Sequence, residues 1–277
     1  MARVIYRQLP RRKLFRFMII SLAVIAIVPP LYLHFNLQQI QLRKCSWMKN
    51  PPLVCAHGGD STRAFPNTID AYRIALSSQV DCVEVDVSRS ADGVLFALHD
   101  RELQQISGNN TSKVGYLSMQ EIRGLVSNHQ HSLKFHDVNI PTLEDALKLI
   151  SRSVRMVILD AKVGPPLHEK ELAKDILSVV GYIVMMDLLT GSRTNLLRMR
   201  GAEVVGVYHP LIDEKVVRIL HRRNKKVYGW TVDDEESMQK MLIEHVDAIV
   251  TSNPSLLHRV MHDIRTRCFE QGFSLSS

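Results

Sequence analysis

The chain has 277 residues and a hydrophobic content of 45%, enough for one barrel-sized domain with a sizeable core, which excludes a disordered protein. Its formal net charge of +7 is uneven, since residues 1–50 hold nine Lys or Arg and no acidic residue, so the other residues carry −2. Because the basic charge belongs to the N-terminal segment, the composition argues against nucleic-acid binding.

The N-terminal segment is typical of a signal anchor. A basic tail at 1–16 precedes an apolar run at 17–35, which lies at the lower edge of the length of a transmembrane helix and above most signal-peptide cores. The alternative is a cleaved signal peptide, because Pro29 and Pro30 would end the helix early, but no small-residue cleavage site follows them. The stronger basic flank of the N-terminal side predicts a single-pass protein with its domain on the lumenal or extracellular side of the secretory pathway.

From residue 53 onward, short apolar runs alternate with amphipathic segments, a pattern typical of βα units and a parallel sheet. We place a polar linker at 36–52 and a short tail at 269–277, on either side of one domain at 53–268. The predicted strands are 53–57, 82–88, 94–99, 155–161, 182–187, 203–208, 226–232 and 247–251. The predicted helices are 67–76, 118–126, 142–151, 169–180, 192–200, 213–223, 235–244 and 254–267.

Eight alternating units in one domain predict an α/β fold, a (β/α)8 TIM barrel preceded by one transmembrane helix. The 55 residues between the third and fourth predicted strands are more than a βα connection needs, so we place a small insertion there. The spacing shows no linker that would divide the domain in two.

The four cysteines have no C-x-x-C spacing, so we expect no structural zinc site. Cys55 and Cys82 lie in apolar runs and are predicted to be buried core thiols rather than bridge partners. Cys45 and Cys268 flank the domain at its two ends and could pair in an oxidising lumen.

Carboxylates gather on two of the predicted strands. In Val83–Val87, strict alternation puts Glu84 and Asp86 on one face and the valines on the other. Two carboxylates in an apolar strand would repel each other, and the usual remedy is a divalent cation, here Mg²⁺ or Ca²⁺ because the ligands are oxygens. Asp160 is a third candidate ligand and Lys162 a candidate phosphate-binding group; the alternatives are a strand-end cap and a surface lysine.

Two histidines stand at the ends of predicted strands beside these carboxylates. His57 ends the first strand, followed by Gly58 and Gly59, which allow a ligand to approach the backbone. His99 ends the third. One such histidine alone is more often a core residue, but two of them at strand ends predict proton-transfer groups.

Taken together, the motifs resemble those of the glycerophosphodiester phosphodiesterase family over residues 54 to about 258. The matching segments are His57-Gly58-Gly59, Pro66-Asn67-Thr68, Glu84-Val85-Asp86-Val87, Asp92-Gly93, His99-Asp100, Leu117-Ser118, Ile140-Pro141-Thr142-Leu143-Glu144, Asp160-Ala161-Lys162, Trp230-Thr231-Val232-Asp233 and Val246-Asp247-Ala248-Ile249-Val250-Thr251-Ser252-Asn253-Pro254.

The resemblance implies hydrolysis of a glycerophosphodiester to glycerol 3-phosphate and an alcohol, with a divalent metal held by Glu84, Asp86 and Asp160. We expect His57 and His99 to act as acid and base, with their order left open. Lys162 would neutralise developing charge on the phosphate. Trp230 would form an apolar wall for the substrate or be a plain core residue.

Three departures from the family pattern concern the phosphate and metal contacts. Gly58 stands where the family usually has Arg, and the family's Pro-Glu-Asn-Thr becomes Phe65-Pro66-Asn67-Thr68, without its Glu. Asp160 stands where the family more often has Glu. Arg63 is near enough in sequence to compensate for the missing Arg. These losses keep two alternatives open: lysophospholipase D-type cleavage of membrane lysophospholipids, and a low-turnover barrel that binds a metal or a lipid headgroup.

Overall fold

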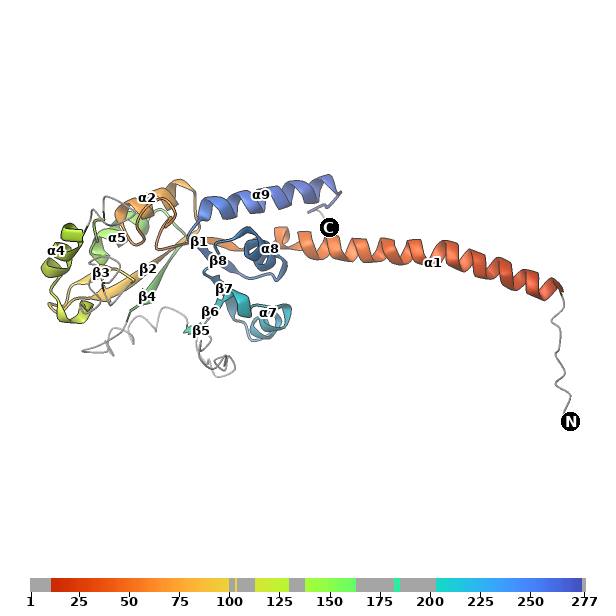
Figure 1. The fold of residues 1–277 in the computed structure, drawn as a ribbon, viewed down its shortest axis with the longest axis horizontal. Coiled ribbons are helices and arrows are strands. Elements are labelled where there is room, and N and C mark those ends of the chain that lie inside the picture. The colour runs from red at the N-terminus through yellow and green to blue at the C-terminus, as the bar shows by residue number, and fades with distance from the viewer. Residues whose placement is uncertain are drawn as a thin grey trace, which may run out of the picture.

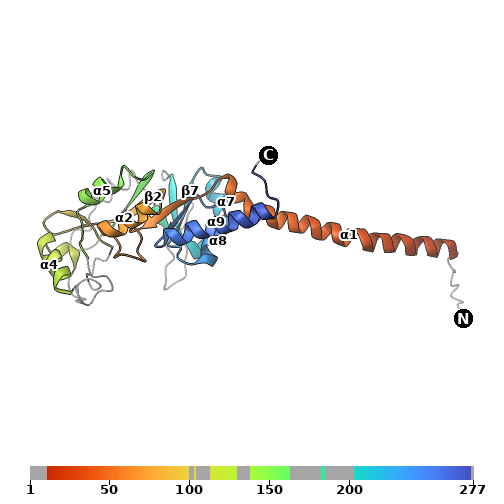
Figure 2. The same ribbon diagram turned by 90° about the horizontal axis from the view of Figure 1, so that it is seen from above.

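The computed structural model describes residues 11–99, 103, 113–129, 138–162, 182–184 and 203–275. It contains a curled sheet flanked by helices, from which a long N-terminal helix projects (Figures 1 and 2). The strands are β1 (Leu53–His57), β2 (Cys82–Arg89), β3 (Leu95–Ala97), β4 (Met156–Ala161), β5 (Tyr182–Val184), β6 (Val204–Tyr208), β7 (Lys226–Trp230) and β8 (Ala248–Thr251). Each overlaps a predicted strand.

The helices also agree with the predictions where the structure describes them. They are α2 (Ile69–Ser77), α4 (Met119–His129), α5 (Leu143–Ile150), α7 (Glu214–His221), α8 (Glu235–Ile243) and α9 (Pro254–Glu270). Several begin at a capping side chain: the Thr142 hydroxyl accepts from the Asp145 amide, and Ser118 and Glu121 form a capping box. The predicted helices 169–180 and 192–200 lie outside the described residues.

Parallel pairing links most of the strands into one sheet, in the order β4-β2-β1-β8-β7-β6-β5. Two registers matter for the site: His57 on β1 pairs with Glu84 on β2, and Asp86 on β2 pairs with Asp160 on β4. Between the residues that the structure describes, no pairing joins β4 to β5. The described strands therefore form a curled half-barrel rather than a closed ring.

Strand β3 differs from the prediction. We expected it to be the third parallel strand of the barrel, but it pairs antiparallel to β2, with Val87 opposite Ala97. The chain turns back through a short hairpin in which Gly93 has φ +82° and the Ser90 amide donates to the Val94 carbonyl. The parallel path goes from β2 to β4, so the insertion follows the second parallel strand.

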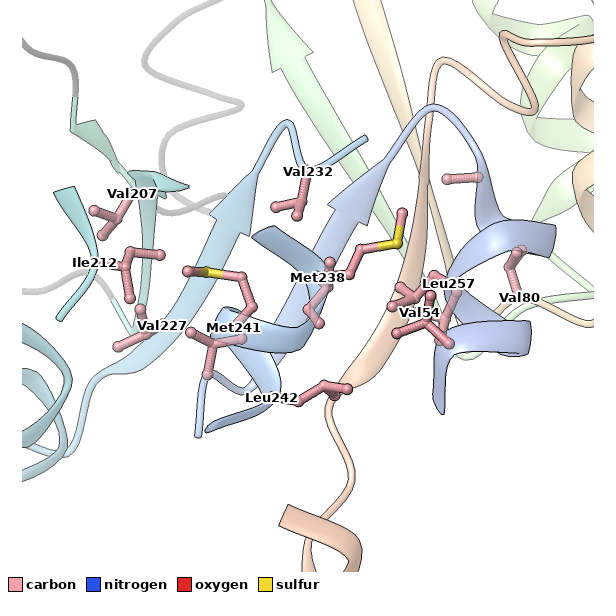
Figure 3. Close-up of a cluster of buried hydrophobic side chains, with 14 of the residues drawn as sticks. Val54, Val80, Val207, Ile212, Val227, Val232, Met238, Met241, Leu242 and Leu257 are labelled. Carbon is pink, nitrogen blue, oxygen red and sulfur yellow. The ribbon is translucent and has the colours of Figure 1, made fainter. Parts of the chain in front are cut away.

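The two faces of the sheet have different partners. On β2, Val83, Val85 and Val87 belong to a large apolar cluster that includes residues of the surrounding helices. Part of this cluster, between β1, β6–β8 and helices α8 and α9, is shown in Figure 3, with Val54 and Leu257 at one end. The alternate positions, such as Cys82 on β2 and Ile158 on β4, form a separate cluster on the inner face. Alternate residues of a strand point to the same face, so Glu84 and Asp86 project from the inner face together with Cys82.

The N-terminal helix α1 (Arg11–Cys45) is 35 residues long and includes Pro29 and Pro30. It is long and apolar enough to cross a membrane, with an 18-residue window of mean hydropathy 2.1. The polar linker expected at 36–52 is helical as far as Cys45, and the 3-10 turn Ser46–Lys49 continues it into the domain. Helix formers such as Leu, Gln, Arg and Lys fill residues 37–44, so polarity alone was a poor guide to a linker.

The cysteines form two disulfides. Cys45 bonds to Cys268 on α9, which confirms the pairing that the sequence allowed. The prediction that Cys55 and Cys82 are unpaired thiols is wrong: both are buried, but the β1–β2 register places them opposite each other and they form the second disulfide, with Cα atoms 4.5 Å apart.

Candidate active site

Three carboxylates meet on the inner face where β2 and β4 lie side by side. Glu84 and Asp86 are buried on β2, and the register brings Asp160 of β4 beside Asp86. One carboxylate oxygen from each residue lies within 4.8 Å of those from the other two. The structure thus brings together the three side chains that the sequence predicted as metal ligands.

Lys162 lies between two of these carboxylates. Its Nζ is 2.6 Å from Asp160 Oδ2 and 2.8 Å from Asp86 Oδ1. Burial alone would lower the pKa of Lys162, but the charges of Asp86 and Asp160 raise it above its ordinary value. Burial alone would likewise raise the pKa of Asp86, and the Lys162 ammonium outweighs burial and lowers it. Both groups are therefore ionised at neutral pH.

Glu84 is in a less favourable position than Asp86. Burial raises its pKa well above 4.5, and the charges of Asp86 and Asp160 raise it further. The Gly58 amide donates to Glu84 Oε2 at 3.0 Å and offsets only part of this cost. When all four groups are ionised, three carboxylates face one ammonium in this cluster, so a divalent cation fits both its charge and its oxygen donors.

The two predicted catalytic histidines lie close together. The ring centroids of His57 and His99 are 6.5 Å apart. His57 is half-buried, and burial lowers its pKa below 6.5, a shift that Asp86 opposes in part. His99 is exposed and reaches this position because the β2–β3 hairpin brings the chain back to the level of Asp86, whose carbonyl accepts from the Leu98 amide.

A residue without a predicted role, Asn67, holds Asp86 from the side opposite Lys162. Its Nδ2 donates to Asp86 Oδ2 at 2.6 Å, while its Oδ1 accepts from the Asp86 amide at 3.1 Å and from the Tyr72 hydroxyl at 3.0 Å. Asn67 is buried and has φ +62°, a conformation that asparagine tolerates better than most residues. The Pro66-Asn67-Thr68 motif was the sequence signal for it, but a motif does not show its partner.

The two glycines after His57 both have a positive φ, and at Gly59 the backbone leaves no room for a Cβ. Gly58 has φ +61°, and Asn67 donates its amide to the Gly58 carbonyl at 2.7 Å. Gly59 has φ +90°, and a Cβ there would lie 2.5 Å from the Ala71 carbonyl carbon. The loop is thereby packed against the start of α2, close to the carboxylates.

The last two predicted substrate residues differ in their placement. Trp230 is the last residue of β7 and lies two positions after Tyr228, so both side chains are on the inner face. The Trp230 ring packs against Tyr208, with ring centroids 5.8 Å apart. It therefore lies on the same face and at the same strand ends as His57. Arg63 instead binds Asp60, donating from Nε at 2.9 Å and from Nη2 at 2.7 Å. Asp60 is fully buried, so this ion pair holds the Arg63 side chain.

Sequence comparisons relate the chain to known phosphodiesterases. The profile of the "Glycerophosphoryl diester phosphodiesterase family" matches residues 57–175 and 167–256. A protein of Arabidopsis thaliana named "Glycerophosphodiester phosphodiesterase GDPD4" is 54% identical over 94% of this chain and 89% of its own length. A glycerophosphodiester phosphodiesterase of Caldanaerobacter subterraneus is 28% identical over 74% of this chain and 96% of its own.

Solved structures show the same fold at low identity. A putative glycerophosphoryl diester phosphodiesterase from Silicibacter pomeroyi has a TM-score of 0.62 and 19% identity, covering 77% of this chain and 94% of that one. An Oleispira antarctica phosphodiesterase, solved with the product sn-glycerol-3-phosphate, also has a TM-score of 0.62 and 19% identity, covering 76% and 97%. The similarity extends over nearly the whole of each solved chain. The strands described above therefore belong to a TIM-barrel-like fold.

Proposed function

The chain belongs to the glycerophosphoryl diester phosphodiesterase family, and from this premise we propose that it hydrolyses glycerophosphodiesters to glycerol 3-phosphate and an alcohol in a metal-dependent reaction. The observation that carries the proposal is the meeting of three carboxylates with two histidines at one edge of the sheet. A barrel that only bound a headgroup would have no use for two proton-transfer groups.

Glu84, Asp86 and Asp160 would hold the metal, and the all-oxygen donor set favours Mg²⁺ or Ca²⁺. When bound, the ion would supply Lewis-acid stabilisation of a phosphoryl oxygen. Lys162 already pairs with two of the three carboxylates, and we place the phosphate of the substrate beside its ammonium. It would neutralise charge that develops on the phosphate oxygens.

His57 and His99 would divide the proton transfers. One imidazole accepts a proton from the attacking hydroxyl or water as the new P–O bond forms, and the other donates a proton to the alkoxide as the old P–O bond breaks. The 6.5 Å between their ring centroids supports a shared role at one phosphodiester group. Imidazoles titrate near neutrality, so each can return to its starting state.

The remaining residues would shape the substrate pocket. Gly58 would let the ligand approach the backbone beside His57, and Trp230 would offer an apolar wall at the end of β7. Arg63 would have to leave Asp60 to replace the arginine that the family usually has after the first histidine. We therefore assign phosphate binding to Lys162 and leave Arg63 out of the proposed site.

We further propose that α1 anchors the enzyme in a membrane with the domain on the lumenal or extracellular side. The exposed apolar side chains of α1, the basic N-terminal flank and the Cys45–Cys268 disulfide support this topology, since disulfides persist in oxidising compartments. Protease added to sealed microsomes should leave the domain intact. Its digestion there would place it on the cytosolic side.

The activity is tested with the full chain in detergent or nanodiscs. We expect release of glycerol 3-phosphate from glycerophosphocholine with Mg²⁺ or Ca²⁺, and none after chelation. A parallel reaction with a lysophospholipid tests the alternative that the anchor favours. Product from the lysophospholipid alone would replace the proposed substrate class, and no product from either would leave only a binding function.

The metal site is tested with Glu84→Gln. In the parent, 100-fold excess of metal over its Kd would raise the free energy of unfolding by about 2.7 kcal/mol, and the variant should lose this gain. Without metal, the pKa of Glu84 is higher in the folded protein than its ordinary value of 4.5, because the buried side chain favours the neutral form. Its contribution to folding stability is therefore fully present below pH 4.5 and is lost as the pH rises through the raised pKa. The variant lacks this loss and should melt at least as high as the parent at neutral pH.

Glu144→Gln is the matched control, because Glu144 is an exposed carboxylate that forms an ion pair with Lys148. It should keep the metal-dependent gain. Unchanged metal stabilisation in Glu84→Gln would remove Glu84 from the site.

A further inference from the structure

The C-terminal helix lies along the end of the N-terminal helix. In both overall views α9 runs beside the C-terminal part of α1 and points back toward its apolar run (Figures 1 and 2). The disulfide Cys45–Cys268 joins the two helices, and Gln41 Nε2 donates to the Gln271 carbonyl at 2.8 Å. The end of α9 is thereby fixed at the level of Gln41.

That level is close to the apolar run of α1. Gln41 lies six residues after Phe35, the last residue of the run, and six residues of α-helix span about 9 Å. Interfacial segments bury their apolar faces about 5 to 10 Å into the boundary between headgroups and acyl chains. If the apolar run crosses a bilayer, the end of α9 lies in or against the headgroup layer.

The side chains at this end of α9 suit such a position. Phe269 is 41% exposed and Leu275 is 46% exposed. In the part of the chain that the structure describes after α1, the only other exposed large hydrophobic residue is Tyr116. The guanidinium of Arg265 lies 5.5 Å from the centre of the Phe269 ring, and Arg267 is also exposed.

We propose that Phe269, Leu275, Arg265 and Arg267 form a membrane-contact surface that docks on the phospholipid bilayer holding α1. The proposal rests on the proposed membrane anchor. The apolar pair enters the interface, and the two guanidinium groups bind headgroup phosphates, a combination typical of segments that lie on a membrane. On α1, the side chains of Leu37, Ile40 and Leu42, which follow the apolar run, are exposed as well.

The consequence is a fixed orientation of the active site. The joint between α1 and the domain is further held by Arg43, which pairs with Glu214 and Glu244, and by the Ser46–His245 hydrogen bond. With α1 through the bilayer and the end of α9 on it, the domain has two contacts with one plane. The site would then keep a constant position relative to the lipid surface.

Depth-dependent fluorescence quenching tests the contact. The full chain is placed in nanodiscs of phosphatidylcholine brominated along the acyl chains, as the parent, as Phe269→Trp and as Tyr116→Trp. The native Trp47 and Trp230 give the parent background, which is subtracted. We expect most of the fluorescence added at position 269 to be lost in brominated relative to unbrominated lipid, and that added at position 116 to be unchanged. Leu275→Trp is the second reporter if Phe269→Trp fails to fold.

Alkaline carbonate extraction of the parent separates this proposal from the anchor. If the parent stays in the membrane but neither Phe269→Trp nor Leu275→Trp is quenched, the membrane-contact surface is wrong and the anchor stands. Equal quenching of Tyr116→Trp would also overturn it, because the contact would not be confined to α9. If carbonate releases the parent, the anchor itself fails and the contact surface with it.

Discussion

The active site and the joint between α1 and α9 both connect distant parts of the chain, but by opposite physical means. At the site, three carboxylates lie within 4.8 Å of one another around one lysine, so like charges are held together at a cost. At the joint, a disulfide links residues 223 positions apart, and an ion pair of two exposed side chains, Arg43 and Glu214, lies nearby. Unfavourable electrostatics kept in a fold indicate function, whereas favourable contacts alone indicate structure.

The largest effect is expected at the site, on rate and not on stability. His57→Gln removes one of the two proton-transfer groups and should lower kcat by about 10² to 10⁴. Its melting temperature should stay close to that of the parent, because His57 is only half-buried. Initial rates of glycerol 3-phosphate release measure the effect, with His262→Gln on the exposed side of α9 as the control. A loss of less than tenfold would contradict a proton-transfer role.

The joint should show the reverse pattern. Cys268→Ser opens the long loop closed by the Cys45–Cys268 bond and should cost about 2 to 5 kcal/mol of unfolding free energy. The kcat of the folded variant should stay within about twofold of the parent, since the joint touches none of the proposed catalytic groups. Denaturant unfolding in detergent gives the stability. Cys45→Ser should give the same loss and the double variant no more; additive losses would show that the bond does not form.

The sequence predicted the charged face of β2 and the strand positions well, because alternation along a strand is a local property. It did not predict the direction of β3. An apolar run of a few residues packs equally well parallel or antiparallel, and direction is set by the connection. The Asp92-Gly93 pair in the short loop before β3 is a hairpin signal and would have indicated the antiparallel pairing.

The site shows the same division between local and non-local information. His99 was predicted as a site residue from its place at the end of a parallel strand, but the hairpin is what returns it to Asp86. Asn67 has no local pattern that reveals its bonds to Asp86, 19 residues away. The pairing of Cys55 with Cys82 likewise depends on the β1–β2 register, which no single run determines.

A smaller effect on the site is expected from its supporting side chain. Asn67→Gly keeps the positive φ without strain but removes three hydrogen bonds at Asp86 and Tyr72, and should weaken metal affinity about 10- to 100-fold. Gln79→Gly is the control variant. Gln79 is exposed and also has a positive φ, +56°, so this substitution changes the backbone entropy of the unfolded chain in the same way without touching the site. Metal titration followed by melting temperature compares the two. Equal affinity in both would make Asn67 a packing residue only.

The smallest effect is expected from the exposed charges of the joint. Arg43 Nη2 lies 3.4 Å from Glu214 and 3.5 Å from Glu244, and the Arg43 side chain is 54% exposed. The Glu244 side chain is only 12% exposed, but both partners of the Arg43–Glu214 pair are exposed. Solvent and salt screen that exposed pair, so Glu214→Gln should cost only about 0.2 to 1 kcal/mol of unfolding free energy, and less in 0.5 M NaCl. Denaturant unfolding of the parent and variant at low and high salt measures the difference. A salt-independent loss as large as that of Cys268→Ser would mean that buried charge holds the joint together, and the contrast with the active site would not stand.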